Sequence, residues 1–155
     1  MRVENVKTLP KAINVPVALT GKITTWANCD ILEKEVNLYN LALKCVAEYI
    51  EDSNLDISLF YTLNVFFTND GSISFVEDSA TNCGHQFHVV IYRMQPLRKL
   101  NSSTKMLFIF IEELVHYFLR ISDETIVKHR VAEIMRYVAP SFNLTQTRGW
   151  GLNWI

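Results

Sequence analysis

The sequence predicts an α+β fold, in which a long helix is followed by a small sheet and then by two further helices. Two observations predict this order. Apolar residues recur with a helical period before residue 52 and again after residue 103, and the stretch between is rich in aromatic, β-branched and turn-forming residues. Because 155 residues suffice to bury one sizeable core, we expect a single domain over residues 1–155.

The first long element is a helix predicted over residues 31–51, where leucines, valines and tyrosines alternate with charged residues at the spacing of an amphipathic helix. Residues 1–28 contain two prolines and a glycine. We expect them to be irregular, with at most one edge strand near the β-like patch at 15–19.

Three strands are predicted after this helix, at residues 58–68, 72–78 and 85–94. Asn-Asp-Gly at 69–71 tolerates the positive φ angles of a tight turn. The sequence therefore predicts that the first two strands form a hairpin, within a small sheet of three or four strands.

Two helices are predicted at the end of the chain, over residues 104–121 and 124–138, and they are expected to fold into a helical hairpin. Ser102 or Ser103 is positioned to cap the first, and a Ser-Asp-Glu break separates it from the second. Residues 139–155 are expected to pack on the core as a tail.

Charge and cysteine content limit the partners and the location that we expect. The net charge is -1, without a long run of either sign, which argues against binding to nucleic acid or to an anionic membrane. No apolar run reaches the roughly 20 residues needed to span a bilayer. Three widely spaced cysteines, Cys29, Cys45 and Cys83, are typical of reduced thiols, so we expect a cytoplasmic protein.

The predicted helix at 104–121 is apolar except for one stripe. At about 100° per residue, Glu112, Glu113, His116 and Arg120 all fall within about 100° of the helix surface. Such a helix is central and buried, and its stripe must face either a polar partner or a cavity. One interpretation is a structural network in which Arg120 pairs with a glutamate; the other is a functional site.

The following helix offers partners for this stripe. If the two helices form an antiparallel hairpin about residues 122–123, His129 lies level with His116 and Glu133 lies level with Glu112. Two imidazoles and several carboxylates are ligands for zinc or iron. The Glu-x-x-His spacing also matches di-iron bundles, but those sites need a second such motif and four long helices.

The segment Glu-Glu-Leu-Val-His at 112–116 resembles the HExxH helix of the zincin metallopeptidases, with Glu112 in place of the first histidine. The order of helix, strands and two helices also resembles a minimal zincin core. The resemblance implies a zinc ion bound by Glu112, His116 and His129, with Glu113 as the general base. Glu133 would then support a ligand or replace His129 as the third one.

The resemblance implies a small zinc-dependent hydrolase, a peptidase, that acts on a peptide or protein. The third predicted strand, at 87–92, would bind the substrate along its edge. The alternative is a non-catalytic relative with a decayed metal site that works by binding a partner. Glu112 keeps this alternative open, because the family has histidine at its position.

Other patterns in the chain predict structure rather than chemistry. Cys83, His85 and His88 lie close in sequence, but positions 83 and 85 share one face of a strand and position 88 the other. Trp150 and Trp154 are expected to pack with the tail. The glycines are few and form no phosphate-binding loop, so nucleotide use is not expected.

Overall fold

The computed structural model describes residues 2–8, 12–76 and 87–147. Its helices are α1 (Glu33–Asp52), α2 (Met94–Lys99), α3 (Ser103–Phe118) and α4 (Glu124–Met135), and its 3-10 turns are η1 (Val17–Leu19) and η2 (Leu144–Thr147). Its strands are β1 (Arg2–Glu4), β2 (Lys7–Thr8), β3 (Ile23–Ala27), β4 (Leu63–Thr68), β5 (Ser74–Val76) and β6 (His88–Arg93). The α+β class is therefore confirmed.

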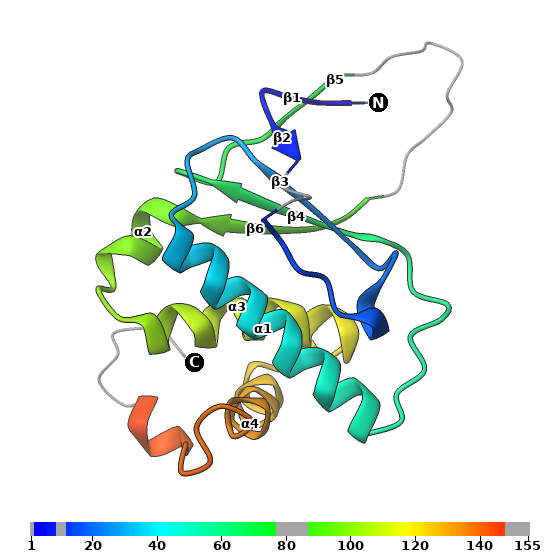
Figure 1. The fold of residues 1–155 in the computed structure, drawn as a ribbon, viewed down its shortest axis with the longest axis vertical. Coiled ribbons are helices and arrows are strands. Elements are labelled where there is room, and N and C mark those ends of the chain that lie inside the picture. Colours follow the sequence, from blue (N-terminus) through cyan, green and yellow to red (C-terminus); the bar gives the residue numbers. More distant parts are fainter. Residues whose placement is uncertain (1, 9–11, 77–86, 148–155) are drawn as a thin grey trace.

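A four-stranded sheet in the order β2-β3-β4-β6 forms the centre of the molecule. Strands β3, β4 and β6 are parallel, and β2 pairs with β3 in the antiparallel sense. The helices cover one face of this sheet, and the two-stranded ribbon of β1 and β5 lies on the other side (Figure 1). Helix α4 packs beneath α1 and α3, farther from the sheet (Figure 1).

The predicted hairpin between residues 58–68 and 72–78 is wrong. A turn does form after β4, where Thr68 Oγ1 accepts a hydrogen bond from the Gly71 N–H at 2.7 Å. The chain then leaves the sheet: Asn28 Nδ2 donates to the Ser72 carbonyl at 3.0 Å, and β5 pairs with β1 instead of β4. Five of the six residues of β4 are buried, as in a parallel strand covered on both faces.

The amino-terminal segment contains more structure than we expected. Residues 17–19 form the turn η1 rather than a strand, and the strand lies later, at β3, which pairs with β4 inside the sheet. Gly21, with a φ of 73°, allows the chain to turn between them. Helix α1 is therefore the crossover between the parallel strands β3 and β4.

The three long helices and two of their caps are confirmed. Ser102 Oγ accepts a hydrogen bond from the Lys105 N–H at the start of α3, and Asp123 Oδ1 accepts one from the Ile126 N–H at the start of α4. The short helix α2 was not predicted. Its Pro96 lies in the first turn, where the missing N–H removes no helical hydrogen bond.

An aromatic cluster joins α1 and α3 to the sheet. The rings of Tyr39, Phe67, Tyr92 and Phe110 pack edge-to-face or stacked, with centroids 4.8 to 6.1 Å apart. The Tyr92 hydroxyl also donates to the Phe110 carbonyl at 2.8 Å. These contacts fix α3 against β6 and therefore fix the position of the polar stripe of α3.

A buried ion pair ties α2 to the start of α1. The Glu35 side chain is fully buried and accepts hydrogen bonds from Arg98 Nε at 2.7 Å and Arg98 Nη2 at 2.9 Å. Burial alone would raise the pKa of Glu35. The Arg98 guanidinium and the Leu32 N–H reverse this and hold the pKa below its usual value.

We expect Arg98→Met to lower the free energy of unfolding by about 3 kcal/mol, because it leaves the Glu35 carboxylate buried without its cation. Urea denaturation measures this change. Lys99→Ala, an exposed position of the same helix, is the control and should change stability by less than about 0.5 kcal/mol. Equal effects of the two substitutions would contradict the stabilising role of the pair.

Candidate metal centre

Helix α3 presents two side chains toward the start of α4. Glu112 and His116 are four residues apart and therefore lie one turn apart on the same face. The Glu112 residue is only 8% exposed, whereas 26% of the His116 side chain is exposed. The surrounding residues of α3 are almost all apolar and buried, which forces this face of the helix into the interior.

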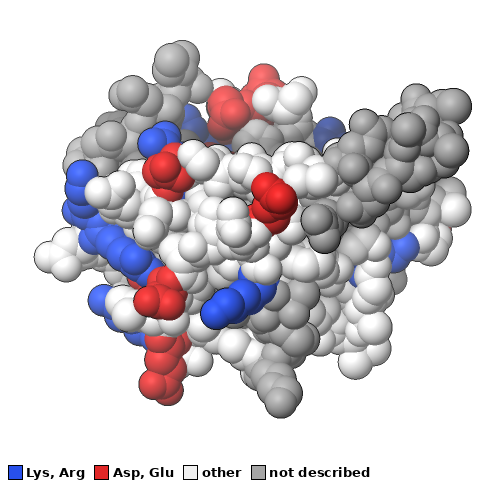
Figure 2. Space-filling model, turned by 90° about the horizontal axis from the view of Figure 1, so that it is seen from above, with Lys and Arg blue, Asp and Glu red and all other residues white. Residues whose placement is uncertain are grey.

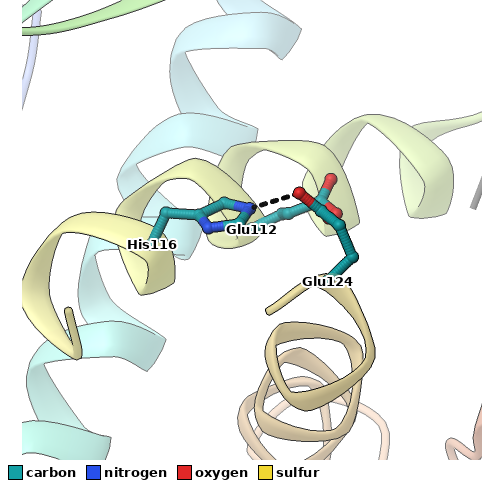
Figure 3. Close-up of side chains that lie close together, drawn as sticks. All are labelled: Glu112, His116 and Glu124. Carbon is teal, nitrogen blue, oxygen red and sulfur yellow. Dashed lines mark ion pairs between the residues drawn. The ribbon is translucent and has the colours of Figure 1, made fainter. Parts of the chain in front are cut away.

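The third member of the group is Glu124, the first residue of α4. Figure 3 shows its carboxylate pointing back toward Glu112 and His116. Because Asp123 caps α4, Glu124 is held in the first helical turn, where the helix dipole favours a negative charge. Its side chain is 53% exposed, so the group is open to solvent on this side.

These three residues form a compact set of metal-binding groups. One ligand atom from each of Glu112, His116 and Glu124 lies within 4.8 Å of the others. The Nε2 atom of His116 is 3.6 Å from Oε1 of Glu124 (Figure 3). One imidazole and two carboxylates supply nitrogen and oxygen ligands, so the group could hold a divalent metal ion.

The electrostatics of Glu112 fit a site for a cation. Burial, together with the nearby carboxylates of Glu113 and Glu124, raises the pKa of Glu112 to about 8, although the Lys128 ammonium acts in the opposite direction. Among the described residues, no hydrogen bond or close ion pair satisfies the Glu112 carboxylate. A bound cation would stabilise the charged form of this carboxylate.

The orientation of His116 also fits metal binding. Its Nδ1 atom lies 2.7 Å from the carbonyl oxygen of Ile121. A carbonyl oxygen only accepts hydrogen bonds, so Nδ1 carries the hydrogen atom in this pair and Nε2 is left with a lone pair. Histidines that bind metals usually make such a bond through their second nitrogen.

The remaining predicted site residues lie elsewhere. His129 is exposed on α4 and does not belong to the group. Glu133 accepts hydrogen bonds from Arg130 Nη1 at 2.8 Å and from the Tyr49 hydroxyl at 3.3 Å, so it links α4 to α1. The Arg120 guanidinium lies over the ring of Phe60, 4.3 Å from its centroid.

Glu113 is half-buried beside the group rather than within it. Burial raises the pKa of Glu113, and the Glu124 carboxylate adds to this shift; only a positively charged His116 would act in the opposite direction. Burial also raises the pKa of Tyr92 well above its usual range, and the carboxylates of Glu113 and Glu112 add to this shift. Glu113 is therefore within electrostatic reach of both the group and strand β6.

The sequence did not identify Glu124 because the expected pairing assumed antiparallel helices. In Figure 3, α4 is seen nearly along its axis while α3 runs across the picture, so α4 crosses α3 steeply. The first turn of α4 then approaches the polar face of α3, which brings Glu124 close to His116, while His129 lies outside the group. The acidic residue directly after the Asp123 cap was the available signal.

Two other predicted clusters involve residues outside the described part of the chain. Cys83, His85, Trp150 and Trp154 lie outside it. His88 is described and stacks on Tyr61, with centroids 5.4 Å apart. In the described part of the tail, Phe142 is buried and its ring lies 6.1 Å from that of Phe108.

Comparisons with known proteins give no match: no family model fits the chain, and neither the curated proteins nor the solved structures contain a match.

None of the described helices combines the length and apolar character needed to cross a membrane. On the face shown in Figure 2, acidic and basic side chains of the described residues are interspersed. The expectation that the protein does not bind nucleic acid remains a prediction.

Proposed function

We propose that the protein is a zinc-dependent hydrolase, specifically a peptidase, with zinc bound by Glu112, His116 and Glu124. The observation that carries the proposal is the compact group of one imidazole and two carboxylates, in which the buried Glu112 carboxylate makes no hydrogen bond to the described residues. When bound, zinc would act as a Lewis acid that polarises a carbonyl group and makes water more acidic.

The residues of the chain itself supply the other functions in this proposal. Glu113 adjoins the group, and the raised pKa of its carboxyl suits a general base that accepts a proton from the attacking water and passes it to the leaving amine. Strand β6 is at the end of the strand order, so its outer edge can pair with an extended peptide. Tyr92, Phe110 and the rest of the aromatic cluster hold β6 next to α3.

The substitution Glu113→Gln tests the assigned base. We expect it to reduce peptide hydrolysis by at least about 100-fold while leaving the zinc content unchanged, because a neutral amide cannot accept the proton. Digestion of casein, followed by mass spectrometry, measures the activity, and atomic absorption measures the zinc.

Glu133→Gln is the matched control, because Glu133 is held by Tyr49 and Arg130 outside the group. It should retain both zinc and activity. Loss of zinc from Glu113→Gln would show that Glu113 is a ligand instead of the base. Full activity of Glu113→Gln would remove it from the mechanism.

A further inference from the structure

The turn between α3 and α4 has a residue in the left-handed region. Helix α3 ends with Leu119 as its cap, and Arg120 follows with a φ of 53°. The Arg120 N–H donates to the Tyr117 carbonyl at 3.3 Å, and the Leu119 N–H donates to the Val115 carbonyl at 3.0 Å. The bond from Leu119 is the last regular α-helical hydrogen bond. The bond from Arg120 and its positive φ are features of a left-handed helix cap, in which the next residue returns over the last turn of the helix.

In this chain the returning residue is Ile121, and the residue beneath it is His116. This arrangement brings the Ile121 carbonyl to 2.7 Å from His116 Nδ1. The hydrogen bond fixes the ring in the orientation in which Nε2 faces Glu124. A helix that ended without the left-handed residue would send residue 121 away from position 116, and the bond would be lost.

We propose that Arg120 is a positioning residue of the metal centre: its left-handed backbone directs the Ile121 carbonyl onto His116 and so selects the imidazole tautomer that leaves Nε2 free to bind metal. This inference rests on the proposed function, because it concerns the same site. It assigns a role in that site to a residue that does not touch the metal-binding group.

The side chain of Arg120 explains how a residue other than glycine remains in this conformation. Glycine is the usual residue at such a position, and a side chain there is unfavourable. The Arg120 guanidinium lies 4.3 Å from the centroid of the Phe60 ring, and this cation–π contact offsets part of the cost. Phe60 in turn stacks on Phe118, with centroids 6.2 Å apart, so the contact fastens the turn to the end of α3.

A series of substitutions at position 120 tests the proposal. Arg120→Gly and Arg120→Asn accept a positive φ, whereas Arg120→Val strongly disfavours it. The tautomer of His116 is read from two-bond ¹H–¹⁵N spectra of the zinc-free protein at pH 8. We expect the Nδ1–H form in the parent protein and in the Gly and Asn variants, and a mixture of both tautomers in the Val variant.

Zinc affinity should follow the tautomer. We expect Arg120→Val to bind zinc about 10- to 100-fold more weakly, the usual effect of losing such a supporting hydrogen bond, and Arg120→Gly to stay within about threefold of the parent protein. Circular dichroism checks the fold of each variant. If Arg120→Val does not fold, Arg120→Ala takes its place. Alanine disfavours a positive φ less strongly than valine, so we expect a smaller loss of zinc affinity in the same direction.

The Nδ1–H tautomer and unchanged zinc affinity in Arg120→Val would overturn the proposal, as would an Nε2–H tautomer in the parent protein. An equal loss in the Gly and Val variants would also overturn it, because the side chain and not the backbone would then be responsible. If the parent protein binds no zinc but the tautomer changes along the series as expected, the proposed function fails while the positioning of His116 by Arg120 stands.

Discussion

Removal of zinc with a chelator should lower the free energy of unfolding by about 4 kcal/mol, if zinc is present at about 1,000 times its dissociation constant. For a chain of this length, we expect the melting temperature to fall by about 10 °C. The cause is the loss of the cation that binds the buried Glu112 carboxylate together with His116 and Glu124. Thermal denaturation with and without chelator measures the change.

Two histidine variants make this prediction specific to the proposed site. His116→Ala should contain no zinc and should melt at the same temperature with and without chelator. His129→Ala should behave like the parent protein, because His129 is exposed and lies outside the group. If chelator has no effect on the parent protein, the zinc site is absent and a non-catalytic, partner-binding protein becomes the better interpretation.

The zinc-free protein should lose stability as the pH rises from about 4.5 to about 8. The pKa of Glu112 is about 8 in the folded protein, against an ordinary value of 4.5, so in this window the folded state binds more protons than the unfolded state. The contribution of Glu112 to the free energy of unfolding is therefore fully present below pH 4.5 and is lost completely above pH 8. The shift sets an upper bound of about 5 kcal/mol on the effect.

The substitution Glu112→Gln isolates this contribution, because it keeps the shape of the side chain and removes the charge. In the presence of chelator at pH 9, we expect the variant to be more stable than the parent protein, by about 2 to 4 kcal/mol. With zinc the order should reverse, because the variant lacks a charged ligand. Urea denaturation at pH 5, 7 and 9 measures both effects. Equal pH dependence of the two proteins would contradict the raised pKa of Glu112.

The helices could be predicted from the sequence because their signals are local. The apolar period of α1 and α3 and the caps Ser102 and Asp123 depend on residues within a few positions of each other. The polar face of α3, with Glu112 and His116, was recognised for the same reason. What these residues contact could not be recognised in this way.

The sheet and the third residue of the candidate metal site depend on the arrangement of distant segments. The turn at Gly71 is a local hairpin signal, yet after it the chain leaves the sheet, where Asn28 donates a hydrogen bond to Ser72, and β4 pairs with β3 and β6. In the same way, Glu124 reaches His116 only because α4 crosses α3 steeply. Neither the strand partners nor the crossing angle follows from the spacing of residues along the chain.

X-ray diffraction from crystals grown with zinc, with data collected on both sides of the zinc absorption edge, tests the central claim most directly. We predict one anomalous peak per chain, bounded by the carboxylates of Glu112 and Glu124 and by Nε2 of His116, with metal–ligand distances of about 2.0 to 2.2 Å. No peak at this position, or a zinc ion bound instead by His129 and Glu133, would contradict the proposed metal centre.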